Sequence, residues 1–298
     1  MIVNYPRMRR RVKGWPDDLD TALEFSSANP FSISAPKNWD GKLEYTNGSG
    51  WKMWDGSAIA SGEIENNHYI YLRGTGNSKI TGTTSSSVKW SIIGTNIACN
   101  GDIDLLLDYS TVKNGNRPAM ASYCYSNMFQ GCTSLTATPS LPATTLASYC
   151  YSNMFQGCTS LTAAPSLPAT TLNTNCYYYM FYGCTSLTTA PSLPATTLAN
   201  NCYYSMFQGC TSLTTVPSLP ATTLANNCYN SMFYLCTKIK LSTTASGTYT
   251  KSYRIPQNGT GTTASGALVY MFGNTGGTFN GAPKINTTYY LDESNTIV

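Results

Sequence analysis

The chain has 298 residues and a formal net charge of +4, and 42% of its residues are hydrophobic, enough to bury a core. Only 11% are Asp, Glu, Lys or Arg, against about 25% in a typical soluble domain. No segment approaches the roughly 20 apolar residues of a membrane span, and no apolar run of signal-peptide length follows the basic start. These features argue against a membrane-spanning or signal-directed protein, and the length predicts two or three structural units.

The first predicted unit is a basic N-terminal arm over residues 1–20. A basic cluster can contact a phosphate surface, nucleic acid or an acidic protein, or it can simply be solvated. The arm holds too few base-reading side chains to predict specific nucleic-acid recognition. We expect it to anchor the chain to other proteins of a larger assembly. The expected anchor residues are Arg7, Arg9, Arg10, Arg11, Lys13 and Trp15.

Residues 21–94 read as short strands separated by turns. The runs LEF, FSIS, KLEY, WKMW, HYIYL and VKWSII are rich in aromatic and β-branched residues, and Asn47-Gly48 is a hairpin-turn pair. About six strands in 70 residues predict an immunoglobulin-like β-sandwich. His68, the only histidine, has no recognisable nucleophile or metal partner in the sequence and is interpreted as an ordinary strand-edge residue.

Residues 95–120 are expected to form an N-terminal cap for the repeats that follow, because a repeat array needs an atypical first unit over its open end. Apolar residues alternate at Ile103, Leu105 and Leu107, which predicts an edge strand. The carboxylates between and around them, at residues 102, 104 and 108, could form an acidic cluster. The alternation favours polar positions on that strand instead.

Residues 121–241 repeat one 26-residue unit nearly five times, and a period of this length indicates a solenoid. From the residue before the first cysteine to the second cysteine, five positions hold the same residue in every copy: in the first copy they are Cys124, Tyr125, Met128, Phe129 and Cys132. Their spacing fits one stripe of a short α-helix. The ends of this segment suit helix caps, because Ser122 and its equivalents are Ser, Thr or Asn, and Gly131 is Gly in four of the five copies.

After each second cysteine comes TSLTxxPSLPATTL. A short strand near residues 135–138 could pair with the next copy, and Pro139 and Pro142 would end it. Strands stack about 4.8 Å apart, whereas helices need 8–10 Å. A coil with both would fan into an arc, with strands on the concave side and helices on the convex rim.

Ten of the eleven cysteines belong to the repeat. Two cysteines eight residues apart on a helix lie too far apart for a disulfide, although equivalent cysteines of adjacent copies could approach. We expect buried thiols that behave as small apolar groups. Zinc is not expected, because no paired CxxC or Cys/His spacing occurs. Residues 242–298 imitate the repeat once more, with Met271 and Phe272 at the Met-Phe position, and are predicted to form a C-terminal cap.

The repeat MFxGCTSLTxxPxLPATTLAxxCYxx resembles the BspA-like group of leucine-rich repeats, whose unit also runs from Phe and Cys through C-x-x-L into a strand. The resemblance covers about 120 residues and implies short helices with short parallel strands. The whole layout resembles surface proteins of gut bacteria and virion proteins of their phages. What the resemblance implies is a binding or structural surface without a catalytic motif.

The function predicted from these observations is non-enzymatic. The repeat offers no acid–base group besides Cys and Tyr, and no catalytic, metal or cofactor site is expected. Tyrosine among short polar residues suits contacts with a host protein or glycan. The expected contact residues vary among the copies: Tyr123, Tyr149, Tyr178, Tyr179, Tyr182, Tyr204 and Tyr234.

An uncharged surface tolerates dense packing beside copies of itself, so a homo-oligomer or multi-copy assembly is expected. The particular prediction is a phage virion component, such as a head fibre, decoration or tail protein, that docks through its N-terminal region to other virion proteins. The alternative is an adhesin-like protein of the bacterial cell surface.

Overall fold

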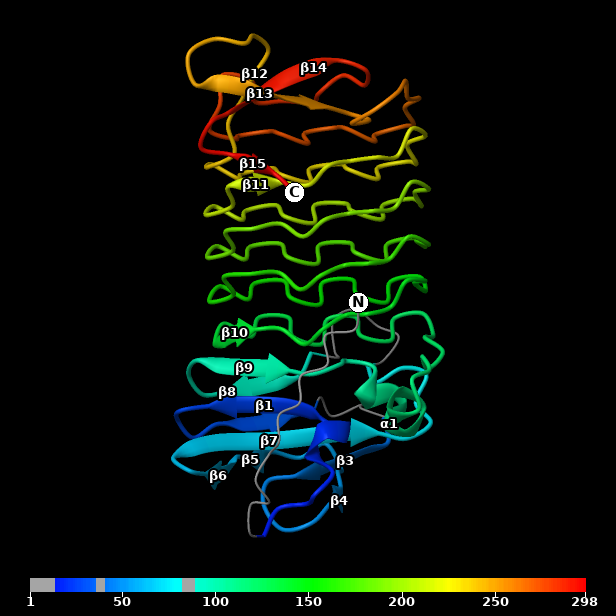
Figure 1. Ribbon diagram of the computed structural model, residues 1–298, viewed down its shortest axis with the longest axis vertical. Coiled ribbons are helices and arrows are strands. Elements are labelled where there is room, and N and C mark those ends of the chain that lie inside the picture. The colour runs from blue at the N-terminus through cyan, green and yellow to red at the C-terminus, as the bar shows by residue number, and fades with distance from the viewer. Residues whose placement is uncertain (1–13, 36–40, 82–88) are drawn as a thin grey trace.

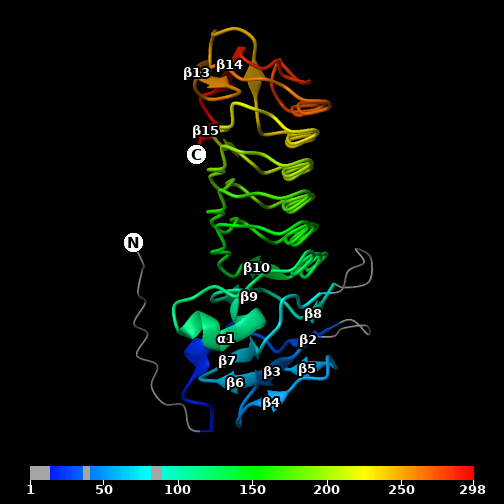
Figure 2. The same ribbon diagram turned by 90° about the vertical axis from the view of Figure 1, so that its right-hand side faces the viewer.

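The computed structural model describes residues 14–35, 41–81 and 89–298. Figure 1 shows an elongated column with a strand-rich front at one end, stacked coils of the 26-residue repeat in the middle and a smaller strand-rich cap at the other end. Each coil passes once through a turn layer, residues 122–132 in the first copy, and returns through a proline layer, residues 139–146. Figure 2 shows these layers on opposite sides of the column.

The turn layer is a run of consecutive tight turns. The N–H of Met128 donates to the carbonyl of Tyr125 (3.2 Å), and that of Cys132 donates to the carbonyl of Phe129 (3.0 Å). Every fourth residue has a left-handed backbone, with φ of +61° at Asn127 and +72° at Gly131. A positive φ at the third position is what a type II turn requires. The later coils have positive φ at the equivalent positions.

The remaining N–H groups of the turn layer point along the column. Tyr125 donates to the carbonyl of Cys150 in the next coil (3.0 Å), and Phe129 donates to that of Met154 (3.0 Å). The same bonds recur from coil to coil, for example from Tyr177 to Cys202 (3.1 Å). Alternate residues therefore bond within a turn and between coils, so the buried backbone is satisfied without a helix or a regular strand.

The expected α/β leucine-rich-repeat solenoid with short helices and short parallel strands is wrong. In the described residues the one α-helix is α1 (Leu105–Lys113), which lies outside the repeat. The stripe of five fixed residues has a four-residue period, which over so short a segment resembles the 3.6-residue period of a helix. The glycine interpreted as a helix C-cap is instead the left-handed residue of a turn.

The expected arc is also wrong, because the column is straight (Figures 1 and 2). Coils hydrogen-bond in the turn layer and again on the other side, where the residues equivalent to Thr145 form parallel bridges through Thr171 and Thr197 to Thr223. Both sides therefore repeat at the spacing of hydrogen-bonded strands, about 4.8 Å. With no wider helical layer, the coils have no reason to fan out.

The five fixed residues of each coil fill the space between the layers, and all are buried. Equivalent rings stack along the column: Tyr151 and Tyr177 have centroids 5.9 Å apart, and Phe155 and Phe181 have centroids 5.6 Å apart. We call the two columns the tyrosine ladder and the phenylalanine ladder. The tyrosine ladder comprises Tyr125, Tyr151, Tyr177, Tyr203 and Tyr229, and the phenylalanine ladder comprises Phe129, Phe155, Phe181, Phe207, Phe233 and Phe272.

The front contains two sheets. A seven-stranded sheet has the order β10-β9-β1-β7-β3-β4, with β6 also paired to β7, and a three-stranded sheet has the order β5-β2-β8. The elements are η1 (Leu19–Thr21), β1 (Leu23–Ser27), β2 (Ser32–Ser34), β3 (Leu43–Thr46), β4 (Lys52–Met53), β5 (Ile59–Ala60), β6 (Gly62–Ile64), β7 (Asn67–Gly74), β8 (Ser91–Ile93), β9 (Ile97–Asn100) and β10 (Leu135–Ala137).

Strands thus form at the strand-like runs, but the predicted separate immunoglobulin-like sandwich is wrong. The larger sheet continues into the repeat, because its strand β9 pairs in parallel with β10, a strand of the first coil. The front also bonds to the turn layer: Ile80 donates to the carbonyl of Cys124 (3.1 Å) and Trp90 to that of Met128 (3.0 Å). Front and coils therefore share one hydrophobic core.

The end of the chain closes the other end of the column. Met271 accepts the N–H of Phe233 (2.9 Å), so residues 266–275 form a further run of turns on the last repeat. The remaining strands are β11 (Thr215–Val216), β12 (Leu241–Ser242), β13 (Tyr249–Arg254), β14 (Thr288–Asp292) and β15 (Thr296–Ile297). They form the sheet β12-β14-β13 and the parallel pair β11-β15.

The left-handed glycines supply a test of the turn layer. An alanine Cβ at Gly157 would lie 3.7 Å from Gly131 Cα, an ordinary contact, so its cost would come from the φ of +71°. We expect Gly157→Ala to lower the free energy of unfolding by about 1 kcal/mol, measured by urea denaturation. Ser166→Ala, at an exposed position, is the control and should change little. An unchanged midpoint for Gly157→Ala would contradict the left-handed turn.

Candidate functional site

The turn layer carries a contiguous group of half-buried tyrosines, which we call the tyrosine strip. Its members are Tyr123, Tyr149, Tyr178, Tyr179, Tyr182 and Tyr204. Tyr123 and Tyr149 stack with centroids 4.5 Å apart, and Tyr178 and Tyr204 stack at 5.0 Å. Tyr179 stands edge-on against Tyr178 at 4.3 Å. The rings belong to four successive coils, so the strip extends roughly 15 Å along the column.

The backbone of the turn layer decides where these rings point. Within each run of turns, the fixed residues face the core and the copy-varying residues lie at the positions between them. Tyr123, Tyr149 and Tyr179 occupy left-handed positions, with φ between +54° and +64°. A bulky residue is unfavourable in a left-handed conformation. At these positions the tyrosine rings also contact other rings of the strip. The strip therefore combines constrained backbone positions with ring-to-ring contacts.

Amide and hydroxyl side chains border the strip. Gln130 donates to Gln156 in the next coil, and the Ser148 hydroxyl donates to Asn173 Oδ1 (2.9 Å). Asn200 Oδ1 accepts the N–H of Asn226 (3.3 Å). Each amide keeps further donor and acceptor capacity, so the border can bond to a ligand with hydroxyl or amide groups.

The electrostatics of the strip are unusual because its coils contain no charged side chain. No Asp, Glu, Lys, Arg or His occurs between Pro118 and Thr237. Burial raises the pKa of the Tyr178 phenol, and the nearby phenols of Tyr179, Tyr204 and Tyr149 raise that pKa further. The Tyr178 phenol therefore stays neutral at physiological pH and presents a hydroxyl dipole rather than a charge.

The structure separates Tyr234 from the other predicted contact residues. Its ring lies 6.3 Å from that of Tyr270 in the next coil, and its hydroxyl accepts a hydrogen bond from Asn274 (2.9 Å). Tyr270, 63% exposed, was missed by the sequence reasoning because the repeat there is degenerate. The sequence feature that could have placed Tyr270 in a turn is the four-residue spacing of Gly266, Tyr270 and Asn274, and all three have a left-handed backbone in the structure.

Of the six predicted anchor residues, Arg7, Arg9, Arg10, Arg11 and Lys13 lie outside the described residues. Trp15 is described, and its ring packs edge-on against Tyr71 at 5.8 Å.

Sequence reasoning missed a cluster beside Trp15. The Arg73 guanidinium lies 3.9 Å from the Trp51 ring and 4.3 Å from the Tyr109 ring. It also pairs with Asp18 (2.5 Å) and Glu44 (2.9 Å). These contacts fasten the segment before β1 to the sheet and to α1. Within the described part of the chain, Trp15 is therefore a packing residue at the root of the arm.

The three carboxylates expected on an edge strand lie elsewhere. The segment is α1 and the turn before it, and Asp108 accepts the N–H of Thr111 inside the helix (2.9 Å). Asp102 and Asp104 both pair with Arg117. Burial and the nearby charge of Asp102 raise the pKa of Asp104 to about 6.

Asp104 ends the tyrosine ladder on the side of the front. The Tyr125 hydroxyl donates to Asp104 Oδ1 (3.1 Å) and contacts the carbonyl of Ile103 (3.2 Å). The alternation of Ile and Leu suggested a strand, but the helix lets Leu105, Leu106 and Leu107 all reach the core. Asp104 is therefore a structural link between the cap and the first coil.

All eleven cysteines are buried and unpaired, as the sequence indicated. Each second cysteine from the second coil onwards donates its thiol to a phenylalanine carbonyl of the preceding coil, as in Cys184 to Phe155 (3.1 Å). Burial raises the pKa of Cys184 to about 12, so this thiol stays protonated and is a weak nucleophile. Among the described residues, no group of three His, Cys, Asp or Glu could hold a metal ion.

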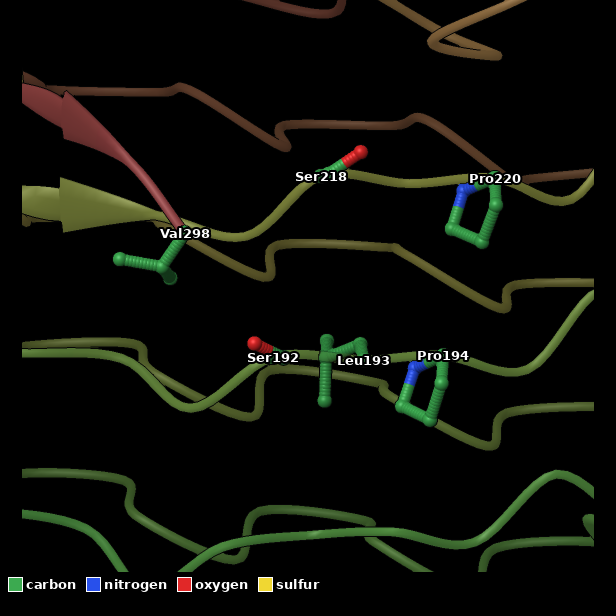
Figure 3. Close-up of a pocket in the computed structure, with 6 residues that line it drawn as sticks. All are labelled: Ser192, Leu193, Pro194, Ser218, Pro220 and Val298. Carbon is green, nitrogen blue, oxygen red and sulfur yellow. The ribbon is translucent and has the colours of Figure 1, made fainter.

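A shallow depression lies in the proline layer, away from the tyrosine strip. Figure 3 shows it between two successive PSLP segments, beside the C-terminal residue of the chain. Its lining comprises Ser192, Leu193, Pro194, Ser218, Pro220 and Val298. It contains no charged side chain and no group suited to catalysis, so it does not compete with the strip as a candidate site.

Comparison with known protein families, curated proteins and solved structures gives no match. Across the described ranges, no helix has the length and apolar character to cross a bilayer.

Asp104 gives the protein a predicted pH dependence. In the unfolded chain its carboxyl titrates near 3.8, whereas in the folded protein its pKa is about 6. The folded state therefore holds the proton more tightly, and this contribution to stability is lost as the pH rises from about 4 to 6. The expected loss is about 3 kcal/mol. Urea midpoints across this range should fall for the native chain, and Asp104→Asn should remove that fall.

Asp20→Asn is the matched control, because Asp20 is exposed. It should leave the pH dependence between 4 and 6 in place. If the urea midpoint of Asp104→Asn falls between pH 4 and 6 as steeply as that of the native chain, the raised pKa of the Asp104 carboxyl beside Tyr125 is contradicted.

Proposed function

We propose that the protein is a non-enzymatic attachment protein that holds a neutral aromatic surface away from an assembly. The observation that carries this proposal is the tyrosine strip, in which six rings form two contacting groups on a hydrogen-bonded column. Tyrosine offers a large contact area with few rotatable bonds and a polar tip, so little entropy is lost when it binds. The column supplies the rigidity that such a surface needs.

The architecture supports the same function. The described residues from 14 onward begin in the front, and the coils that carry the strip lie beyond it along the column (Figure 2). We propose that the front attaches the chain to partner proteins while the coils remain accessible. The preferred assembly is a phage virion, in which the protein would be a head fibre, decoration or tail component present in many copies. The alternative is an adhesin-like protein on a bacterial cell surface.

Binding to cells tests the strip. Each substitution in Tyr178→Ser/Tyr179→Ser/Tyr182→Gln/Tyr204→Ser introduces the residue that another coil holds at that position, so the fold should persist. We expect the labelled variant to bind target cells about tenfold more weakly than the native chain, as expected for the loss of central aromatic contacts. A panel of bacterial strains tests the virion proposal, and animal epithelial cells test the adhesin alternative.

The matched control is Tyr234→Gln/Tyr270→Ser, which removes two tyrosines outside the strip and should bind like the native chain. Equal binding by the strip variant and the native chain would contradict the proposed surface, and so would an equal loss in the control.

The arm has its own test, because its role as an anchor is independent of the strip. Deleting residues 1–13 should leave the circular dichroism spectrum and binding to cells unchanged, but should prevent incorporation into the parent assembly. Antibody labelling of purified particles or whole cells measures that incorporation. Normal incorporation of the shortened chain would show that the arm is not the anchor.

A further inference from the structure

We infer that the ligand of the tyrosine strip is a neutral glycan, a chain of uncharged sugars lying along the column. This inference rests on the proposed function and specifies the chemistry of its ligand. Three independent features of the strip lead to it: the absence of charge, the open and extended shape, and the alternation of aromatic and amide groups.

The absence of charge on the coils disfavours most other polymers. Beyond the first coil, which the Lys79 segment of the front contacts, a carboxylate, phosphate or ammonium group brought onto the strip would lose water and meet no opposite charge from the coils, and desolvating an unpaired charge is costly. An anionic polysaccharide or a nucleic acid is therefore disfavoured. Typical protein surfaces are disfavoured for the same reason, because about a quarter of the residues of soluble proteins are charged.

The shape of the strip suits a chain rather than a small molecule. Its six rings occupy four successive coils, and the depression described in the proline layer lies on the other side of the column. Equivalent positions of adjacent coils carry stacked rings in the pairs Tyr123–Tyr149 and Tyr178–Tyr204, the second pair three residues later in its turns than the first. Within each pair the rings repeat from one coil to the next, so the strip offers repeated aromatic contacts to a ligand that itself repeats.

The side chains that border the strip can form hydrogen bonds with sugar hydroxyls. A hydroxyl both donates and accepts a hydrogen bond, and the side-chain amides of Gln130, Gln156, Asn173 and Asn200 combine both capacities. The rings would contact the C–H surfaces of the sugars, while their phenolic hydroxyls and the bordering amides would bond to the sugar hydroxyls. Because the rings are fixed by contacts with each other, binding would order few additional side chains.

The test is a glycan array that carries neutral and acidic oligosaccharides, probed with the labelled full-length chain. We expect binding to neutral glycans, little change when salt is raised, and about a tenfold loss in the Tyr178→Ser/Tyr179→Ser/Tyr182→Gln/Tyr204→Ser variant. Tyr234→Gln/Tyr270→Ser should retain binding. Binding confined to acidic glycans, binding that salt abolishes, or no neutral glycan bound would overturn the inference.

Treating target cells with periodate, which cleaves sugar diols, separates this inference from the proposed function. Loss of strip-dependent adhesion after treatment supports the glycan. Strip-dependent adhesion that survives treatment would overturn the glycan and leave the attachment function intact. Absence of any strip-dependent adhesion would overturn both.

Discussion

The hydrogen bond from every second N–H of the turn layer to a carbonyl of the next coil is the constraint on which the rest of the structure depends. Tyr125, Asn127 and Phe129 all make it, at 2.9–3.0 Å. Each coil is thereby placed one strand spacing from its neighbours, and equivalent side chains must lie one above another. The tyrosine and phenylalanine ladders, the column of thiols bonded to phenylalanine carbonyls and the straightness of the column all follow from this register.

The same register explains how a long charge-free segment can serve as a surface. Ion pairs play no part between Pro118 and Thr237, because the segment has no charged side chain. Stability there comes from buried fixed residues and from paired backbone groups, while the charged clusters of the described residues lie in the front and the cap. The copy-varying positions lie between the fixed core residues, and several of them hold tyrosine. Under the proposed function, recognition and folding would depend on different residues of the same turn.

The sequence predicted the burial pattern of the repeat correctly and its backbone wrongly. Cys124, Met128 and Cys132 are buried as expected, but their spacing fits both a helix and a series of four-residue turns. The distinguishing signal was weak: Asn127 and Gly131, which tolerate a left-handed backbone, follow each other at an interval of four. Likewise, alternating Ile103, Leu105 and Leu107 indicated a strand, whereas the short helix α1 buries three successive leucines against the first coil and the sheet.

By itself, the sequence determined the 26-residue period, the set of residues that faces the core and the neutrality of the surface, because these depend only on residue type and spacing. Tertiary structure alone decided that the coils form a straight column, that six of the seven candidate tyrosines meet in one strip, and that Asp104 lies below the tyrosine ladder. These features depend on the bonds between coils and between the front and the first coil, which join residues distant in sequence. Local patterns cannot specify such contacts, because the same short pattern is compatible with more than one backbone.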